Sequence, residues 1–226
     1  MGLFADIYGE NTLQKSRIAV ISDHLLGTLV DAVNRVDTEV KLIGLTSTQE
    51  KEGVTTVTHL IANALCTSTY FRSLVVDAGL HNPAMHRVEN IPEAPGLSDV
   101  ILSKELRWKE AIKSKKEPVC YVLPAGKSVE SLVDFFMHPR VYDFLKDLRS
   151  AFNFVLFDLP PVGTYPEILP FISELDAVLF VVRAHYTRVR AAQVAVDRLK
   201  RGGVLILGGI LNRKRYYIPE TLYKMF

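Results

Sequence analysis

The sequence predicts a doubly wound α/β fold, in which a mainly parallel sheet is covered by helices on both faces. Near-continuous apolar segments of strand length recur along the chain, at 40–46, 74–77, 119–123, 154–158, 177–182 and 204–211. Helical patterns separate several of them, and strands that are apolar throughout are typical of parallel sheets buried on both faces. Right-handed crossovers would then bring the carboxyl ends of the strands to one crevice, where α/β proteins bind ligands.

The composition fits one globular domain, 17–226, after a flexible tail of residues 1–16 that shows no clear periodicity. The balance of 27 basic and 25 acidic residues in 226 predicts no nucleic-acid partner. No apolar segment approaches the ~20 residues of a membrane helix, and no signal-peptide pattern is present, so a cytoplasmic location is expected. Cys66 and Cys120 lack metal-ligand spacing and are expected to be buried thiols.

The segment from Ser22 to Val36 has apolar residues at helical spacing, which predicts an amphipathic helix. This helix either covers the sheet or docks on a partner. In the second case the partner would desolvate Leu25, Leu29 and Val33.

The segment 42–65 reads as an apolar strand, a polar turn with a glycine, and a helix, which is where α/β proteins hold phosphate. In the pattern G-x-x-x-x-G-K-[ST], backbone N–H groups and the Lys bind phosphates, and the hydroxyl binds Mg²⁺. Gly53 and Thr55 match this pattern, but Val54 replaces the Lys and Thr48 the first Gly. The candidate cofactor-binding residues of this loop are Lys51, Gly53, Val54, Thr55 and Thr56.

Two apolar segments downstream of this loop end in carboxylates, LVVD at Asp77 and FVLFD at Asp158. In a parallel sheet both would reach the edge where the loop lies, and Mg²⁺ prefers oxygen ligands. Asp158 is expected to end a central strand beside the strand at 42–46. Asp77 and Asp158 are therefore candidate catalytic residues, and together with Thr55 they are candidate Mg²⁺ ligands.

Seven segments together resemble the cytoplasmic kinase domain of the bacterial tyrosine kinases that control capsule and exopolysaccharide synthesis. They are TSTQEKEGVTT, LVVDAGLHNPAMH, GLSDVIL, YVLPAG, FVLFDLPPV, DAVLFVVRA and LGGILN, within 41–226. The resemblance implies a P-loop NTPase-like fold, ATP or ADP with Mg²⁺ as cofactors, and a hydrogen bond from Asn212 to adenine. It also implies a membrane-embedded polysaccharide chain-length regulator, or co-polymerase, as partner, a homo-oligomer, and a peripheral position at the inner membrane.

The sequence departs from the resembled family at residues that carry catalysis. Besides Val54, Gly79 stands at the second Asp of the family pattern Asp-Ala-Asp-Leu-Arg, and His81 stands at its Arg. Loss of one such electrostatic contact removes about 3 to 4 kcal/mol of transition-state stabilisation. The sequence therefore predicts a catalytically degenerate kinase-like protein that is a regulatory or scaffold component of exopolysaccharide synthesis or export. Nucleotide and Mg²⁺ binding would be weak or lost, and Asp77 and Asp158 vestigial.

Two alternatives remain open. The first is an active, autophosphorylating tyrosine kinase with a rearranged phosphate loop, in which Lys51 and Asp158 act and Tyr216, Tyr217 and Tyr223 are candidate acceptors. The second is a partition or positioning ATPase switch, which lacks support because no Lys stands early in the loop and no basic DNA-binding face is evident.

Overall fold

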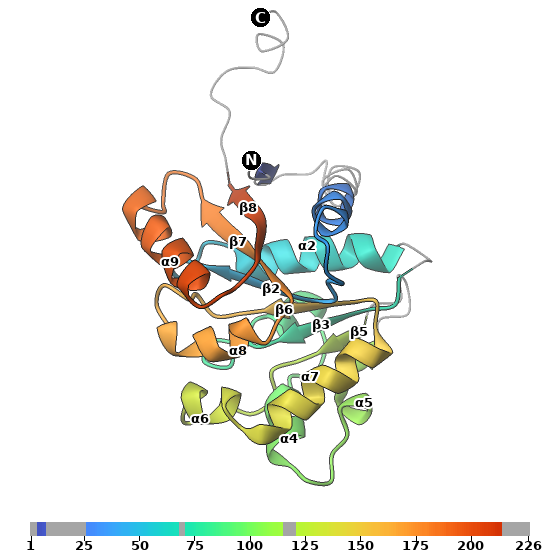
Figure 1. The fold of residues 1–226 in the computed structure, drawn as a ribbon. Helices are drawn as coiled ribbons and strands as arrows, with labels where there is room; N and C mark the ends of the chain where they lie inside the picture. The colour runs from blue at the N-terminus through green and yellow to red at the C-terminus, as the bar shows by residue number, and fades with distance from the viewer. Residues whose placement is uncertain (1–3, 8–25, 68–70, 115–120, 214–226) are drawn as a thin grey trace, which may run out of the picture.

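The computed structural model describes residues 4–7, 26–67, 71–114 and 121–213 (Figure 1). The described strands form one eight-stranded sheet in the order β1-β8-β7-β2-β6-β3-β5-β4, and every pair is parallel except β4 with β5. Their bounds are β1 Phe4–Ile7, β2 Leu42–Ser47, β3 Ser73–Asp77, β4 Lys113–Ser114, β5 Tyr121–Leu123, β6 Phe154–Asp158, β7 Ala177–Arg183 and β8 Ile206–Asn212. The predicted doubly wound, mainly parallel sheet is confirmed.

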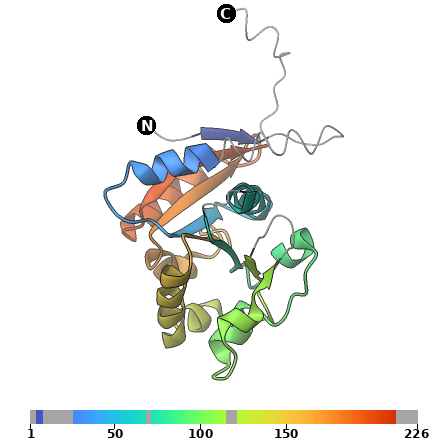
Figure 2. The same cartoon turned by 90° about the vertical axis from the view of Figure 1, so that its right-hand side faces the viewer.

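Helices lie on both faces of this sheet (Figures 1 and 2). Beside a helical segment at 26–34, they are α2 Val54–Thr67, α3 Met85–Glu89, α4 Leu97–Leu102, α5 Trp108–Ala111, α6 Leu132–Phe136, α7 Pro139–Ala151, the 3-10 helix η1 Pro166–Ile168, α8 Leu169–Ser173 and α9 Val189–Arg201. One apolar cluster joins the 26–34 helix, α2 and α3 to one face, and a second joins α4 to α9 to the other. The core is therefore two layers separated by the sheet.

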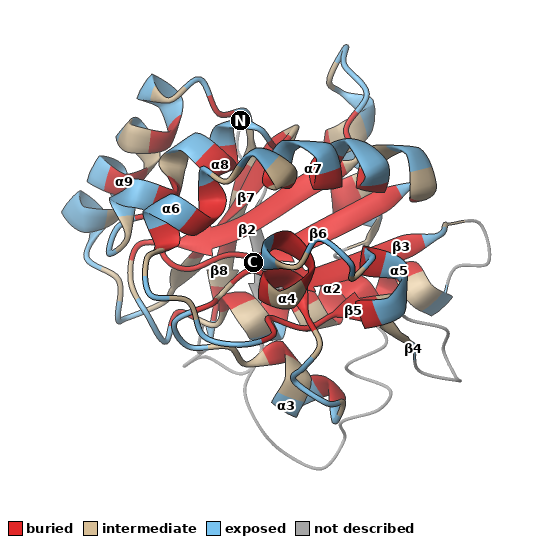
Figure 3. Cartoon of the chain, turned by 90° about the horizontal axis from the view of Figure 1, so that it is seen from below, coloured by how far each residue is buried: buried red, intermediate tan, exposed pale blue. Residues whose placement is uncertain are grey.

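Side-chain alternation along the central strands fills both layers. In β6, Leu156 packs in the cluster of α2, whereas its neighbours Val155 and Phe157 pack in the cluster of α7. Every residue of β2, β3 and β6 is buried (Figure 3). Because both faces of these strands are covered, apolar residues stand at nearly every position rather than at alternate ones.

The 26–34 helix covers the protein's own sheet. Leu29 is 2% exposed and Ala32 6% exposed, and Leu29 packs in the same cluster as α2, with Val33 against it. The alternative in which a partner desolvates Leu29 is therefore wrong, because intramolecular packing already buries it. Leu25, named in the same alternative, lies outside the described residues.

Three further findings concern the N-terminal segment, the cysteines and the length of the helices. Within the predicted tail of residues 1–16, Phe4–Ile7 form β1 and pair in parallel with β8. Cys66, predicted to be a buried thiol, is half-buried and disulfide-bonded, so that prediction is wrong. Cys120 lies outside the described residues. Within the described ranges, no helix is both long and apolar enough to cross a membrane.

Candidate phosphate-binding site

The predicted phosphate loop connects the buried end of β2 to the first turn of α2. Two of its residues have left-handed backbone, Lys51 with φ 65° and Gly53 with φ 93°. The amide of Val57 donates to the carbonyl of Gly53 at 3.0 Å, which is the first backbone hydrogen bond of α2. The N–H groups before Val57 have no carbonyl within the helix to bond, and such a helix N-terminus attracts anions.

A buried carboxylate inside the loop fixes its shape. Glu52 is 1% exposed, and its Oε2 accepts a hydrogen bond from the amide of Thr48 at 2.8 Å. The hydroxyl of Thr187, from the turn after β7, donates to its Oε1. The negative charge of Glu52 is thus stabilised by donors within the protein, and the loop is tied to the turn after β7.

Two further side chains hold the loop from the ends of β7 and β8. Arg183 donates from Nη1 to the carbonyl of Lys51 at 3.1 Å, and Asn212 donates from Nδ2 to the carbonyl of Glu52 at 2.9 Å. A Cβ at Gly53 would lie 2.1 Å from Nδ2 of Asn212, so this approach requires glycine. Asn212, predicted to contact adenine, is buried against the loop and bonds its backbone.

Asp158 lies where the sequence places it, at the end of β6 and opposite Leu45 of the adjacent β2. It is 4% exposed, and Thr55 donates a side-chain hydrogen bond to it. Burial raises the pKa of the Asp158 carboxyl well above its usual range, the nearby charge of Asp77 raises it further, and the Thr55 hydrogen bond lowers it. The expected position beside the strand at 42–46 is confirmed.

Asp77 ends β3 opposite Asp158, but its carboxylate serves the loop that follows it. Its Oδ1 accepts from the amide of Gly79 at 3.1 Å, and its Oδ2 accepts from the amides of Ala84 at 3.2 Å and Met85 at 2.9 Å. Burial raises the pKa of Asp77, and these three backbone hydrogen bonds oppose that rise. The side chain therefore anchors the start of α3.

A pocket of about 450 Å³ opens over the loop. The loop residues 49–56, Asp158 and Gly79 line it, together with residues at or after the ends of β3, β6, β7 and β8. Tyr165 donates its hydroxyl to Oε1 of Glu50 at 3.2 Å, and its ring lies 5.5 Å from that of His81, centroid to centroid. Of the two carboxylates predicted to bind Mg²⁺, Asp158 lines the pocket and Asp77 does not.

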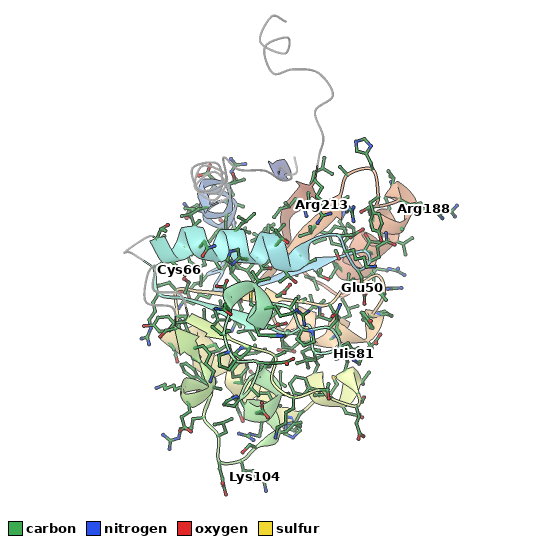
Figure 4. All side chains as sticks on the ribbon, turned by 180° about the vertical axis from the view of Figure 1, so that it is seen from behind. Glu50, Cys66, His81, Lys104, Arg188 and Arg213 are labelled. Atoms are coloured by element: carbon green, nitrogen blue, oxygen red, sulfur yellow. The ribbon has the colours of Figure 1, made fainter. Side chains whose placement is uncertain are left out.

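Several pocket residues were not predicted from the sequence as site residues, among them Tyr165, Arg183 and Arg213. Tyr165 follows the Leu-Pro-Pro turn after Asp158, and Arg183 and Arg213 follow the apolar segments of β7 and β8. Their positions at strand ends were the available signal, because all carboxyl ends of parallel strands meet at one edge. Figure 4 shows Glu50, His81 and Arg213 on the same side of the molecule.

A Mg²⁺ ion would meet an incomplete set of protein ligands here. Thr55 and Asp158 are placed to contribute oxygens, but Gly79 has no carboxylate and Asp77 is directed to backbone amides. Across the part of the chain that is described, no three His, Cys, Asp or Glu side chains are grouped to hold a metal ion. The residues present therefore fit a Mg²⁺ site only in part.

Comparison with known proteins shows which proteins this sequence resembles. No protein-family model matches the sequence. The tyrosine-protein kinase CpsD of Streptococcus pneumoniae is 25% identical over 176 residues, 77% of this chain and 77% of CpsD. YwqD of Bacillus subtilis, also a tyrosine-protein kinase, is 23% identical over 80% of this chain and 75% of its own length. The chain's relatives are bacterial tyrosine-protein kinases.

Another relative of this tyrosine-kinase-like chain is larger. The succinoglycan biosynthesis transport protein ExoP of Rhizobium meliloti is 24% identical over 178 residues, which are 77% of this chain but 22% of ExoP. The region similar to this chain is thus about a fifth of that protein.

Solved structures support the P-loop NTPase-like fold. The chimerical protein CapA2B2 superimposes with a TM-score of 0.85 at 22% identity, over 94% of each chain. The septum site-determining protein MinD of Pyrococcus horikoshii, complexed with Mg-ADP, gives 0.65 at 23% identity, over 83% of this chain and 77% of MinD. At these identities, the likeness to both structures establishes the shared fold.

Proposed function

We propose that this chain is a catalytically degenerate relative of the tyrosine-protein kinases, and that it is a regulatory or scaffold component of exopolysaccharide or capsule biosynthesis or export. The observation that carries the proposal is Val54, which stands where the phosphate loop pattern has Lys. Its side chain is 9% exposed and packs in the apolar cluster under α2. Valine therefore offers no ammonium group to the phosphates at this position.

The second missing group is a carboxylate at Gly79. Phosphoryl transfer to a tyrosine depends on stabilisation of the phosphoryl charge and on a base positioned at the attacking hydroxyl. Gly79 lines the pocket without a side chain, and the adjacent Asp77 carboxylate is engaged by backbone amides. Each loss removes a contact that is made at the reacting centre, so the remaining site supports binding better than transfer.

The partner that this proposal assigns is a membrane-embedded polysaccharide chain-length regulator or co-polymerase. The relation to ExoP, named for succinoglycan biosynthesis and transport, supports this assignment. Docking on such a partner would hold the chain at the cytoplasmic side of the inner membrane, and a homo-oligomer would present several copies to it. The 26–34 helix is excluded as the sole apolar docking face, because its Leu29 is buried.

A complementation experiment tests the proposal. The gene for this chain is deleted, and polymer production is measured after return of the wild type or of Asp158→Asn, a variant that removes the remaining pocket carboxylate at a strand end. A non-catalytic role predicts that Asp158→Asn restores polymer and still copurifies with a membrane polysaccharide protein. A folded Asp158→Asn variant that binds the partner but restores no polymer would contradict the proposal.

A further inference from the structure

We infer that the pocket binds a chain of two or three phosphates, as in ADP or ATP, without a divalent metal ion. In this inference Lys51, Arg183 and Arg213 supply the positive charge that the pattern's lysine and Mg²⁺ supply elsewhere. The inference deepens the proposed function and rests on it, because a site that binds without transferring phosphate has no need to activate a γ-phosphate.

Three cations at the pocket have no partner of opposite charge among the described residues. Lys51, Arg183 and Arg213 all line it. Among the described residues, no carboxylate lies within ion-pair distance of any of the three. Arg183 uses one guanidinium nitrogen for the carbonyl of Lys51, and its plane lies over the ring of Tyr186 at 4.5 Å from the centroid. These side chains are available to an anion that enters the pocket.

The carboxylates that line the same pocket are each engaged by donors. Glu50 accepts from the hydroxyl of Tyr165, Glu52 accepts from loop amides and Thr187, and Asp158 accepts from Thr55. At least one oxygen of each carboxylate is thus occupied by a donor within the protein, whereas no carboxylate of the described residues pairs with the three cations. The pocket therefore offers unpaired cationic donors to an anion, while oxygens of its carboxylates are already engaged by protein donors.

The backbone of the loop supplies the second half of an anion site. The left-handed residues Lys51 and Gly53 turn the chain so that the N-terminus of the fourteen-residue α2 opens into the pocket. Its first N–H groups have no partner within the helix, and phosphate groups bind at such termini. Because Glu52, Arg183 and Asn212 hold the loop without any ligand, this arrangement is pre-organised.

The donor set at the strand ends explains why metal is not required. A protein site for Mg²⁺ uses one or two carboxylates together with the substrate phosphates, and of the strand-end positions expected to supply them Asp158 lines the pocket, Asp77 does not, and Gly79 has no carboxylate. A phosphate chain would therefore meet the amides and cations described above, with Asp158 as the one strand-end carboxylate in the pocket. Removal of Mg²⁺ takes away little of this binding.

Calorimetric titration of the full chain tests the inference. ADP, ATP, pyrophosphate and tripolyphosphate are titrated in EDTA and again in Mg²⁺. We expect binding in EDTA, with a Kd for ADP that differs by less than about threefold from its value in Mg²⁺. Tighter binding of ADP than of pyrophosphate would show that the nucleoside is recognised, and equal binding that the phosphates suffice; both support the inference.

Charge-removing variants identify the cations. Lys51→Gly removes one charge at a residue with φ 65°, where glycine is favoured, and Arg213→Ala removes another. Together they should weaken ADP binding in EDTA at least about tenfold, with a shallower salt dependence. Lys104→Gly is the matched control, because Lys104 is exposed and lies at the opposite end of the molecule (Figure 4). It should leave the Kd unchanged.

Three results would overturn the inference: binding that requires Mg²⁺, no binding of any of the four anions in EDTA, or an unchanged Kd in the Lys51→Gly, Arg213→Ala pair. Failure of the proposed function looks different. Phosphotyrosine on the wild-type chain after incubation with ATP and Mg²⁺ would refute the non-catalytic role, whatever the titrations in EDTA show.

Discussion

The ends of β3 and β6 lie side by side and carry the same chemical group, yet the two carboxylates have different roles. Asp77 and Asp158 face each other across the parallel pair. Asp77 accepts three backbone N–H groups from the loop before α3, whereas Asp158 accepts the hydroxyl of Thr55 and lines the pocket. The loop that follows each strand decides the difference.

The comparison shows that the role of an aspartate at a strand end depends on which groups donate hydrogen bonds to its carboxylate. Amides that surround Asp77 make it an internal cap for a turn, which stabilises the fold. Asp158 accepts from one hydroxyl, is buried, and lies near the like charge of Asp77. Ionised groups in such surroundings lower the stability of the fold and are typical of functional sites. Loss of the acceptor oxygens at Asp77 should therefore destabilise the fold, whereas loss of the charge at Asp158 should stabilise it.

The largest effect is expected at Asp77. Asp77→Ala leaves the buried amides of Gly79, Ala84 and Met85 without their acceptor, so the free energy of unfolding should fall by about 3 kcal/mol or more. Asp77→Asn keeps one acceptor oxygen and should lose less. Urea denaturation measures both variants. A loss below about 1 kcal/mol in Asp77→Ala would show that the cap is dispensable.

A smaller change, in the free energy of ADP binding, is expected from a substitution in the loop that faces Asp158. Val54→Lys restores a cation beside the phosphates and should tighten ADP binding about tenfold, or 1.4 kcal/mol, without producing phosphotyrosine. Val54→Met is the matched control, because it adds length without charge. Equal affinities of the two variants, measured by calorimetry, would mean that a side chain at this position does not reach the phosphates.

The smallest effect, of opposite sign to that at Asp77, is expected in Asp158→Asn. Because the pKa of Asp158 is raised in the folded state, its ionisation opposes folding once the pH exceeds the carboxyl's unfolded pKa of about 4. The variant should therefore raise Tm by about 2 to 4 °C at neutral pH in EDTA.

The pH dependence of the Tm difference between Asp158→Asn and the wild type tests whether ionised Asp158 destabilises the fold. Below about pH 4 both states of the wild type are protonated at Asp158, so the gain in Tm should vanish there and grow as the pH rises. Asp147→Asn, at an exposed position of α7, is the control and should change little. A lower Tm for Asp158→Asn at neutral pH would show that the ionised carboxylate stabilises the fold.

Much of the sheet was predictable from the sequence because burial on both faces leaves apolar segments such as FVLFD and AVLFVV. The strand end at Asp158 followed from the same rule. The 3-10 helix η1 and α8 were not predicted, since they are short and each has a proline at one of its first two positions that reads as a turn residue. Short elements of this kind depend on packing against the sheet more than on local pattern.

The roles of the site residues were less predictable. The loop residues and Asp158 are together as expected, but the partners of Asp77 come from amides seven and eight residues later. Backbone donors leave no mark on side-chain identity, so no sequence pattern reports them. Arg183 and Tyr165 reach the pocket through the ends of other strands, and only the strand order brings them together.

The central claim, that this pocket binds phosphate groups but does not transfer them, is tested most directly with γ-labelled ATP and the purified wild-type chain in Mg²⁺. Label incorporation and phosphotyrosine are measured beside an ADP titration of the same sample. The account predicts ADP binding with no label on the protein. Incorporation of label into tyrosine that is lost in Asp158→Asn would contradict it and identify an active kinase.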